Sequence, residues 1–160
     1  MLTRMIGISL LALAPLAAPA ADPEAPFPGS GYLFYGPGRA PGGGSLQQLG
    51  IGGEAFVYRG LALGAEGGYM FSSNYFDYGV GLVSLNPSYH FNRSRHARIS
   101  PFVTGGYSLA FRGGITSLYN FGGGITWWIG DRFGLRLGVR DYVLPRSEHT
   151  PMFSLAFSFR

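Results

Sequence analysis

The sequence predicts an all-β fold, an eight-stranded antiparallel transmembrane β-barrel. Three observations lead to this prediction: apolar residues recur at every second position, aromatic residues collect at the ends of the alternating stretches, and charged residues make up only 12% of the 160 residues. A period of two is typical of strands, whose side chains point alternately to the two faces of a sheet. A water-soluble domain has about 25% charged residues, so the low charge favours an apolar surrounding.

Residues 1–20 have the pattern of a secretory signal peptide. A basic residue precedes an apolar run over residues 5–16, and the segment closes on Ala18-Pro19-Ala20, an A-x-A cleavage site. A membrane-spanning helix would need about 20 apolar residues, and prolines interrupt this run. We therefore expect three parts: a signal peptide over residues 1–20, a flexible lead-in over residues 21–29 and a barrel over residues 30–160.

The alternation is clearest over residues 97–112. Ile99 and Val103 belong to an apolar face, whereas the opposite face carries small, polar or charged residues such as Ser100 and Arg112. Strands of about 10–16 residues are long for a soluble sandwich and suit tilted strands that cross a bilayer. Stretches of this kind predict eight strands, at residues 30–39, 46–58, 61–72, 75–91, 97–112, 118–129, 133–144 and 151–160.

The connections and the aromatic residues agree with a closed barrel. A sheet in lipid must close because its edges would find no hydrogen-bond partners, and outer-membrane barrels have short periplasmic turns and an aromatic girdle at each interface. Tight, basic turns are predicted at residues 59–60, 92–96 and 130–132; the other connections, at 37–45, 73–74, 113–117 and 145–150, are slightly longer on the whole. One predicted girdle flanks the tight turns (Tyr58, Tyr89, Phe91, Trp127, Phe133), and the other lies at the far ends (Phe71, Phe76, Tyr78, Phe111, Tyr119).

Charged residues of the strands fall on the face opposite the apolar one. Leu137 is expected to face lipid, whereas Arg136 and Arg140 point into the barrel. Glu54 and Glu66 lie symmetrically about a tight turn, so a simple hairpin register would pair them on the interior face. Because buried charges are usually paired, we expect these two carboxylates and two arginines to form an interior ion network that is structural rather than catalytic.

A second ion pair is expected at the extracellular mouth. In the fourth predicted strand the apolar parity changes between Leu82 and Leu85, which predicts a β-bulge near Val83-Ser84. Above this bulge, Asp77 would lie opposite Arg112 with both side chains facing inward.

These features resemble the small OmpA/OmpX-type outer-membrane β-barrel family. The resemblance covers about residues 30–160 and is carried by the hairpin FGGGITWWIGDRFGLRLGVRDY, the signal peptide and the final strand MFSLAFSFR. It implies a bacterial outer-membrane location with outer-membrane lipids and the barrel-assembly machinery as partners, and we expect a monomer. In this family the machinery reads a last strand that alternates apolar residues and ends in phenylalanine; here Arg160 follows the corresponding residues Phe153, Leu155, Phe157 and Phe159.

Other motifs carry less weight. Residues 50–55 fit the dinucleotide fingerprint G-x-G-x-x-G/A, but that pattern requires a helix where this strand continues. His90, His96 and His149 are expected at separate places, so the sequence predicts no metal site and no cofactor. The consecutive Ser-Glu-His at residues 147–149 does not converge as a catalytic triad does. The arginines, mostly scattered singly, argue against a nucleic-acid partner, and the chain has no cysteine for disulfides.

The leading functional prediction is a non-enzymatic integral outer-membrane protein that supports envelope integrity. Side chains fill the interior of an eight-stranded barrel, so we expect at most a gated low-conductance path and no diffusion pore. Two alternatives stay open: an outer-membrane lipid-modifying enzyme on the same barrel, and a periplasmic lipocalin-like binder. The second would turn its apolar face inward, against the expected position of the charged residues.

Overall fold

The structure is a computed structural model that describes residues 28–92, 97–145 and 147–160. The predicted signal peptide, most of the lead-in (residues 21–27) and most of one tight turn (residues 93–96) lie outside the described residues. The described chain forms eight strands: β1 (Gly29–Arg39), β2 (Ser45–Tyr58), β3 (Leu61–Ser72), β4 (Tyr75–His90), β5 (Ile99–Phe111), β6 (Ile115–Trp128), β7 (Phe133–Val143) and β8 (His149–Phe159).

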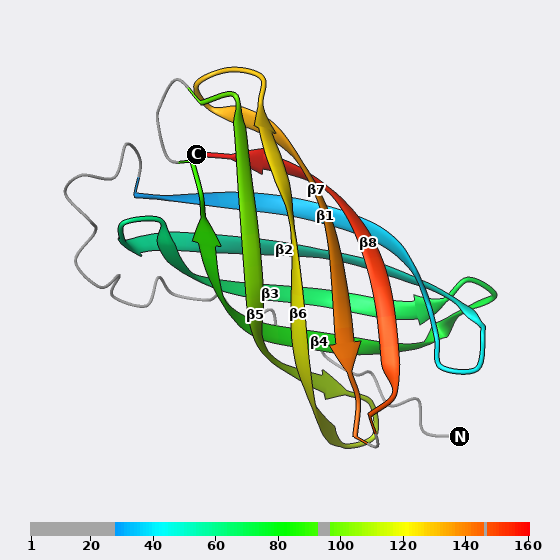
Figure 1. Ribbon diagram of the computed structural model, residues 1–160. Coiled ribbons are helices and arrows are strands. Elements are labelled where there is room, and N and C mark those ends of the chain that lie inside the picture. Colours follow the sequence, from blue (N-terminus) through cyan, green and yellow to red (C-terminus); the bar gives the residue numbers. More distant parts are fainter. Residues whose placement is uncertain (1–27, 93–96, 146) are drawn as a thin grey trace, which may run out of the picture.

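The eight strands form one closed antiparallel barrel in sequence order (Figure 1). β1 closes the barrel against β8, with Tyr32 opposite Ser158. The predicted fold class is therefore confirmed. The largest difference in strand boundaries is at Ile115, where β6 begins three residues earlier than predicted because Ile115 already pairs with Phe111.

The two ends of the barrel differ in their connections. The terminal end, named for the start of β1 and the end of β8, carries the two-residue β2–β3 turn (Figure 1). In that turn Arg59 and Gly60 have φ angles of 33° and 94°, the left-handed conformation that a tight hairpin requires and that glycine adopts without strain. The loop end carries the β1–β2, β3–β4, β5–β6 and β7–β8 connections.

The outward face of the barrel is apolar. The large apolar side chains that it exposes, such as Leu33, Ile51, Leu85, Leu137 and Leu155, are between 40% and 70% accessible. A soluble domain would bury most of these side chains, so this surface suits an apolar solvent. The described part of the chain has no helix long and apolar enough to cross a membrane.

Buried side chains of two kinds point into the interior. Towards the loop end lies a buried cluster, called here the apolar plug, formed by Leu82, Leu118, Tyr142 and Met152. Towards the terminal end, Trp128 is buried and the guanidinium of Arg160 lies 4.2 Å from its ring centroid. Polar and charged side chains occupy the level between them.

The structure corrects the expected position of Leu82. The apolar parity placed this residue on the lipid side, just above a bulge near Val83-Ser84, but it is only 3% exposed and belongs to the apolar plug. The β4–β5 register is continuous from Gly81 to His90, and the irregularity in β4 lies nearer its start, opposite Met70 and Ser72 of β3. The apolar residue at this position therefore belongs to the apolar plug inside the barrel. It does not indicate that the strand exchanges its inward and outward faces.

Candidate functional site: the interior polar network

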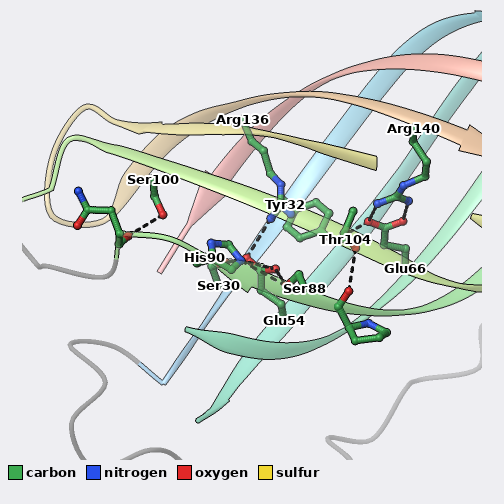
Figure 2. Close-up of polar contacts among 12 residues, drawn as sticks. Ser30, Tyr32, Glu54, Glu66, Ser88, His90, Ser100, Thr104, Arg136 and Arg140 are labelled. Atoms are coloured by element: carbon green, nitrogen blue, oxygen red, sulfur yellow. Dashed lines mark hydrogen bonds and ion pairs between the residues drawn. The ribbon is translucent and has the colours of Figure 1, made fainter. Parts of the chain in front are cut away.

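Four charged residues from opposite walls meet inside the barrel. Glu54 on β2 and Glu66 on β3 point inward, and Arg136 and Arg140 reach them from β7. All four side chains are at most 15% exposed. Figure 2 shows that they lie in two groups, one around each carboxylate.

The first group surrounds Glu54. Arg136 donates a hydrogen bond to its Oε1 at 2.9 Å, and the Ser30 hydroxyl donates to the same oxygen at 3.0 Å. The other oxygen, Oε2, accepts from the Ser88 hydroxyl at 3.1 Å and lies 3.2 Å from His90 Nε2 (Figure 2). Both oxygens of this buried carboxylate are therefore satisfied, as a buried charge requires.

The second group surrounds Glu66. Arg140 donates to both carboxylate oxygens, and the Tyr32 hydroxyl donates to Oε1 at 2.7 Å. Tyr32 also joins the two groups, because the Arg136 guanidinium lies 4.7 Å from the centroid of its ring. The same guanidinium lies 3.7 Å from the ring centroid of Phe102, so two aromatic rings make cation–π contacts with it.

The expected direct pairing of Glu54 with Glu66 does not occur. In the observed register Glu54 faces Gly64 and Glu66 faces Gly52. The turn consists of Arg59 and Gly60 alone, so Tyr58 pairs with Leu61, and the pairing shifts by one further residue between Phe56 and Tyr58. The two carboxylates are therefore diagonal neighbours, each opposite a glycine. The missing side chain at Gly52 leaves room for the Tyr32 ring and the Glu66 side chain.

Sequence reasoning missed Tyr32, Ser88, His90 and Phe102 as members of the network. Each lies at an inward position of its strand, with the same alternation that identified Arg136. Tyr32 gave no signal by itself because aromatic residues are common on both faces of this chain. For His90 the sequence predicted only a place apart from His149, and the structure shows it inside the barrel near the terminal end, in contact with the rings of Phe56 and Phe102.

The Ser88, His90 and Glu54 side chains are close together, but they do not have the geometry of a catalytic triad. A triad uses one imidazole nitrogen for the serine and the other for the acid. Here Ser88 Oγ, at 3.3 Å, and Glu54 Oε2, at 3.2 Å, approach the same nitrogen, Nε2. All three residues are buried inside the barrel. The arrangement suits a buried ion cluster better than a nucleophile that must meet a substrate.

The structure does not bring Asp77 and Arg112 together, contrary to expectation. These two described residues form no ion pair with each other, and the Arg112 guanidinium lies 5.3 Å from the ring centroid of Tyr78. The pairing of Gly81 with Phe111 places Asp77 well beyond the level of Arg112. The expectation depended on the bulge near Val83-Ser84, and without that bulge the register separates the two charges.

The other predicted site residues lie on the outward face. The residues of both expected girdles are exposed, apart from the half-buried Phe71. Several of the girdle rings contact each other, including Tyr89 with Phe91 at 5.2 Å and Phe71 with Phe76 at 4.8 Å between centroids. The proposed assembly residues are all exposed along the outer side of β8: Phe153, Leu155, Phe157 and Phe159.

A cavity of about 30 Å³ lies among residues of the network and the plug, including Glu66, Arg136 and Met152. This volume holds one or two water molecules. Within the described residues, no three histidine, cysteine, aspartate or glutamate side chains are grouped so that they could hold a metal ion. Residues 50–55 of the fingerprint-like motif continue as strand β2.

Three solved outer-membrane barrels resemble this structure. The N-terminal barrel domain of OprF from Pseudomonas aeruginosa has a TM-score of 0.62 at 17% identity, covering 81% of this chain and 96% of that one. Neisserial surface protein A has a TM-score of 0.61 at 12% identity, covering 82% and 94%. Ail from Yersinia pestis, solved in complex with a heparin analogue, has a TM-score of 0.54 at 10% identity, covering 82% and 96%. No protein-family model and no curated protein matches the sequence.

These likenesses define the class of the fold. It is a closed eight-stranded antiparallel barrel of the kind that spans membranes. More narrowly, it is the fold of the small outer-membrane barrels of the OmpA/OmpX type, which confirms the resemblance inferred from the sequence. At these identities the similarity extends to the fold alone.

Proposed function

We propose that this chain is an exported, non-enzymatic protein of the bacterial outer membrane that supports the integrity of the envelope. The observation that carries the proposal is the division between the two faces of the barrel. Apolar side chains and aromatic rings cover the outside, and the buried ion pairs Glu54–Arg136 and Glu66–Arg140 lie inside. A barrel in lipid requires this division.

The filled interior supports a structural role over a diffusion pore. The apolar plug occupies the loop end, the polar network occupies the middle, and the cavity between them is about 30 Å³. Ions could pass only if the network and the plug rearranged together. We therefore propose at most a gated path of low conductance. The purified protein in planar bilayers should show no steady open state, and a large constant conductance would contradict the proposal.

Both alternatives conflict with particular features. A lipocalin-like binder needs an apolar inward face around a ligand cavity, whereas here the charged residues face inward. A lipid-modifying enzyme needs a nucleophile or base that meets lipid at the outer wall. The described serine, histidine and glutamate that do lie together, Ser88, His90 and Glu54, are buried in the interior instead.

The decisive experiment is a gene deletion complemented with variants. The deletion strain should become more sensitive to detergents and to large antibiotics that the outer membrane excludes, and the wild-type gene should restore resistance. Genes encoding Ser88→Ala or His90→Phe should restore it too, because a non-enzymatic barrel needs no nucleophile. Unchanged sensitivity after deletion would refute the envelope role. A mass change in the membrane lipids that depends on Ser88 or His90 would favour the enzyme.

The outward apolar side chains of β8 support the proposed recognition by the barrel-assembly machinery. Phe153, Leu155 and Phe157 form an exposed row that ends at Phe159, and the Arg160 side chain turns back towards Trp128 and towards the carbonyl of Asp131. Arg160 therefore leaves Phe159 free at the end of the row. Deleting Arg160 should leave assembly in cells unchanged, whereas Phe159→Ser should reduce the folded barrel in the outer membrane.

A further inference from the structure

A groove runs along the outer wall of the barrel over β6, β7 and β8. Its volume is about 400 Å³, in the range of small-molecule sites, and it is open towards the surrounding lipid. Apolar side chains form its walls: Ile125, Leu137, Val139, Phe153 and Leu155. Each of these five side chains is between 41% and 64% exposed, so the walls stand free on the lipid side.

The groove exists because one outward position of β6 has no side chain. Gly123 pairs with Val103 on one side and Val139 on the other, so it lies in the middle of the outward surface. A Cβ at Gly123 would lie 2.8 Å from the Phe102 carbonyl oxygen, so the strands come too close there for any other residue. The close approach of β5 thus leaves a furrow between the neighbouring apolar side chains.

A cationic side chain lies just beyond the loop end of this groove. Pro37 of β1 lines the groove, and Arg39 is two residues further on the same outward face. Arg39 is exposed, with its guanidinium near Gly43 of the β1–β2 connection, and it forms no ion pair with another described residue. Asp141, a carboxylate of β7 at the same end of the barrel, is paired with His149 at 2.5 Å.

We propose that the groove and Arg39 together bind one lipid of the outer leaflet whose phosphate-bearing headgroup has a net negative charge. Its acyl chain would lie against Ile125, Leu137 and Leu155, and its phosphate would pair with the Arg39 guanidinium. This assignment rests on the membrane-embedded barrel of the proposed function. An acyl chain is the species that surrounds this wall in a bilayer, and an unpaired arginine at headgroup level favours a negatively charged head.

The test uses the full chain folded in detergent micelles and two probes with identical acyl chains, phosphatidylglycerol and phosphatidylcholine. Native mass spectrometry counts the lipids that each folded barrel retains. The wild type should retain a single phosphatidylglycerol in preference to phosphatidylcholine. Arg39→Gln should weaken that preference about fivefold, the usual effect of one basic residue near a membrane surface. Arg112→Gln, at the same end of the barrel and over Tyr78, is the matched control and should leave the preference unchanged.

The groove itself is tested by filling it. Leu137→Trp should reduce the retention of both lipids, whereas Leu85→Trp, an exposed outward position on the opposite wall, should not. Equal retention of the two lipids by the wild type, or an Arg39→Gln barrel with unchanged preference, overturns the proposal. A wild-type protein that forms dimers, together with a Leu137→Trp variant that does not, also overturns the proposal. In that case a second copy of the chain, and not a lipid, would occupy the groove. Gel mobility before and after boiling confirms that each variant is a folded barrel, so loss of the lipid site is distinguished from loss of the fold.

Discussion

Arg136 connects the two groups of the interior network. Its guanidinium pairs with Glu54 and lies over the rings of Phe102 and Tyr32, and Tyr32 in turn holds Glu66. A buried charge of this kind is favourable only while its partner is present, because the carboxylate has already lost its water. The local cost of an unpaired Glu54 therefore decides how the barrel responds to changes at this position.

Arg136→Leu should lower the free energy of unfolding by about 3–5 kcal/mol, the usual cost of breaking a buried ion pair from one side. The measurement is reversible urea unfolding of the barrel in lipid vesicles. Arg132→Leu, in the exposed β6–β7 turn, is the control and should change the value by less than about 0.5 kcal/mol. Equal effects of the two substitutions would mean that the interior pair contributes nothing.

At the scale of the strand, alternation in the sequence predicted which face each residue of β7 occupies, including Leu137 outside and Arg136 inside. It did so because a barrel strand has the same two surroundings along its whole length. Alternation could not predict register, since register depends on turn geometry and on shifts such as the one between Phe56 and Tyr58. Because register could not be predicted, the sequence analysis missed Tyr32 and His90 as partners in the network. For the same reason it expected an Asp77–Arg112 pair that does not form. Leu82 was misplaced for another reason, namely that part of this interior is itself apolar.

The observed register of β2 predicts which glycine is required. An added Cβ at Gly52 would lie 2.5 Å from the Tyr32 ring and 2.8 Å from Glu66 Cγ, whereas at Gly67, on the outward face of β3, it would meet nothing within 4 Å. Gly52→Ala should destabilise the barrel by about 1–3 kcal/mol through overpacking. Gly67→Ala should be neutral or slightly stabilising. The same unfolding experiment compares them, and a Gly52→Ala barrel as stable as the wild type would contradict this register.

The face assignment of β7 is tested by placing a charge on its outward side. Leu137→Arg should cost about 2–4 kcal/mol in vesicles, the penalty for a cation on the lipid face near the midplane. The control is Ile129→Arg, which should cost much less. Ile129 is exposed beyond the end of β6, where the chain leaves the bilayer. A Leu137→Arg barrel that unfolds at the wild-type urea concentration would show that water, and not lipid, surrounds this wall.

For the whole molecule, continuous pairing around the barrel predicts resistance to denaturation by detergent. Since β1 and β8 close the sheet, no free edge remains where the described strands could begin to separate. The protein should therefore migrate as a compact band on a detergent gel without heating and shift to its unfolded position after boiling. A single band at the unfolded position under both conditions would contradict a closed barrel in the membrane.

The two interior ion pairs also affect the rates of folding and unfolding. Glu54 and Arg136 are 82 residues apart in the chain, and Glu66 and Arg140 are 74 apart, so neither pair can form before the last strands arrive. Contacts that form late are absent from the folding transition state and act mainly on the unfolding rate. Arg136→Leu should thus accelerate unfolding and leave the insertion rate almost unchanged, which stopped-flow tryptophan fluorescence in vesicles can measure. The ion pairs then give the barrel kinetic stability: because they slow unfolding, an assembled barrel stays in the bilayer over long periods.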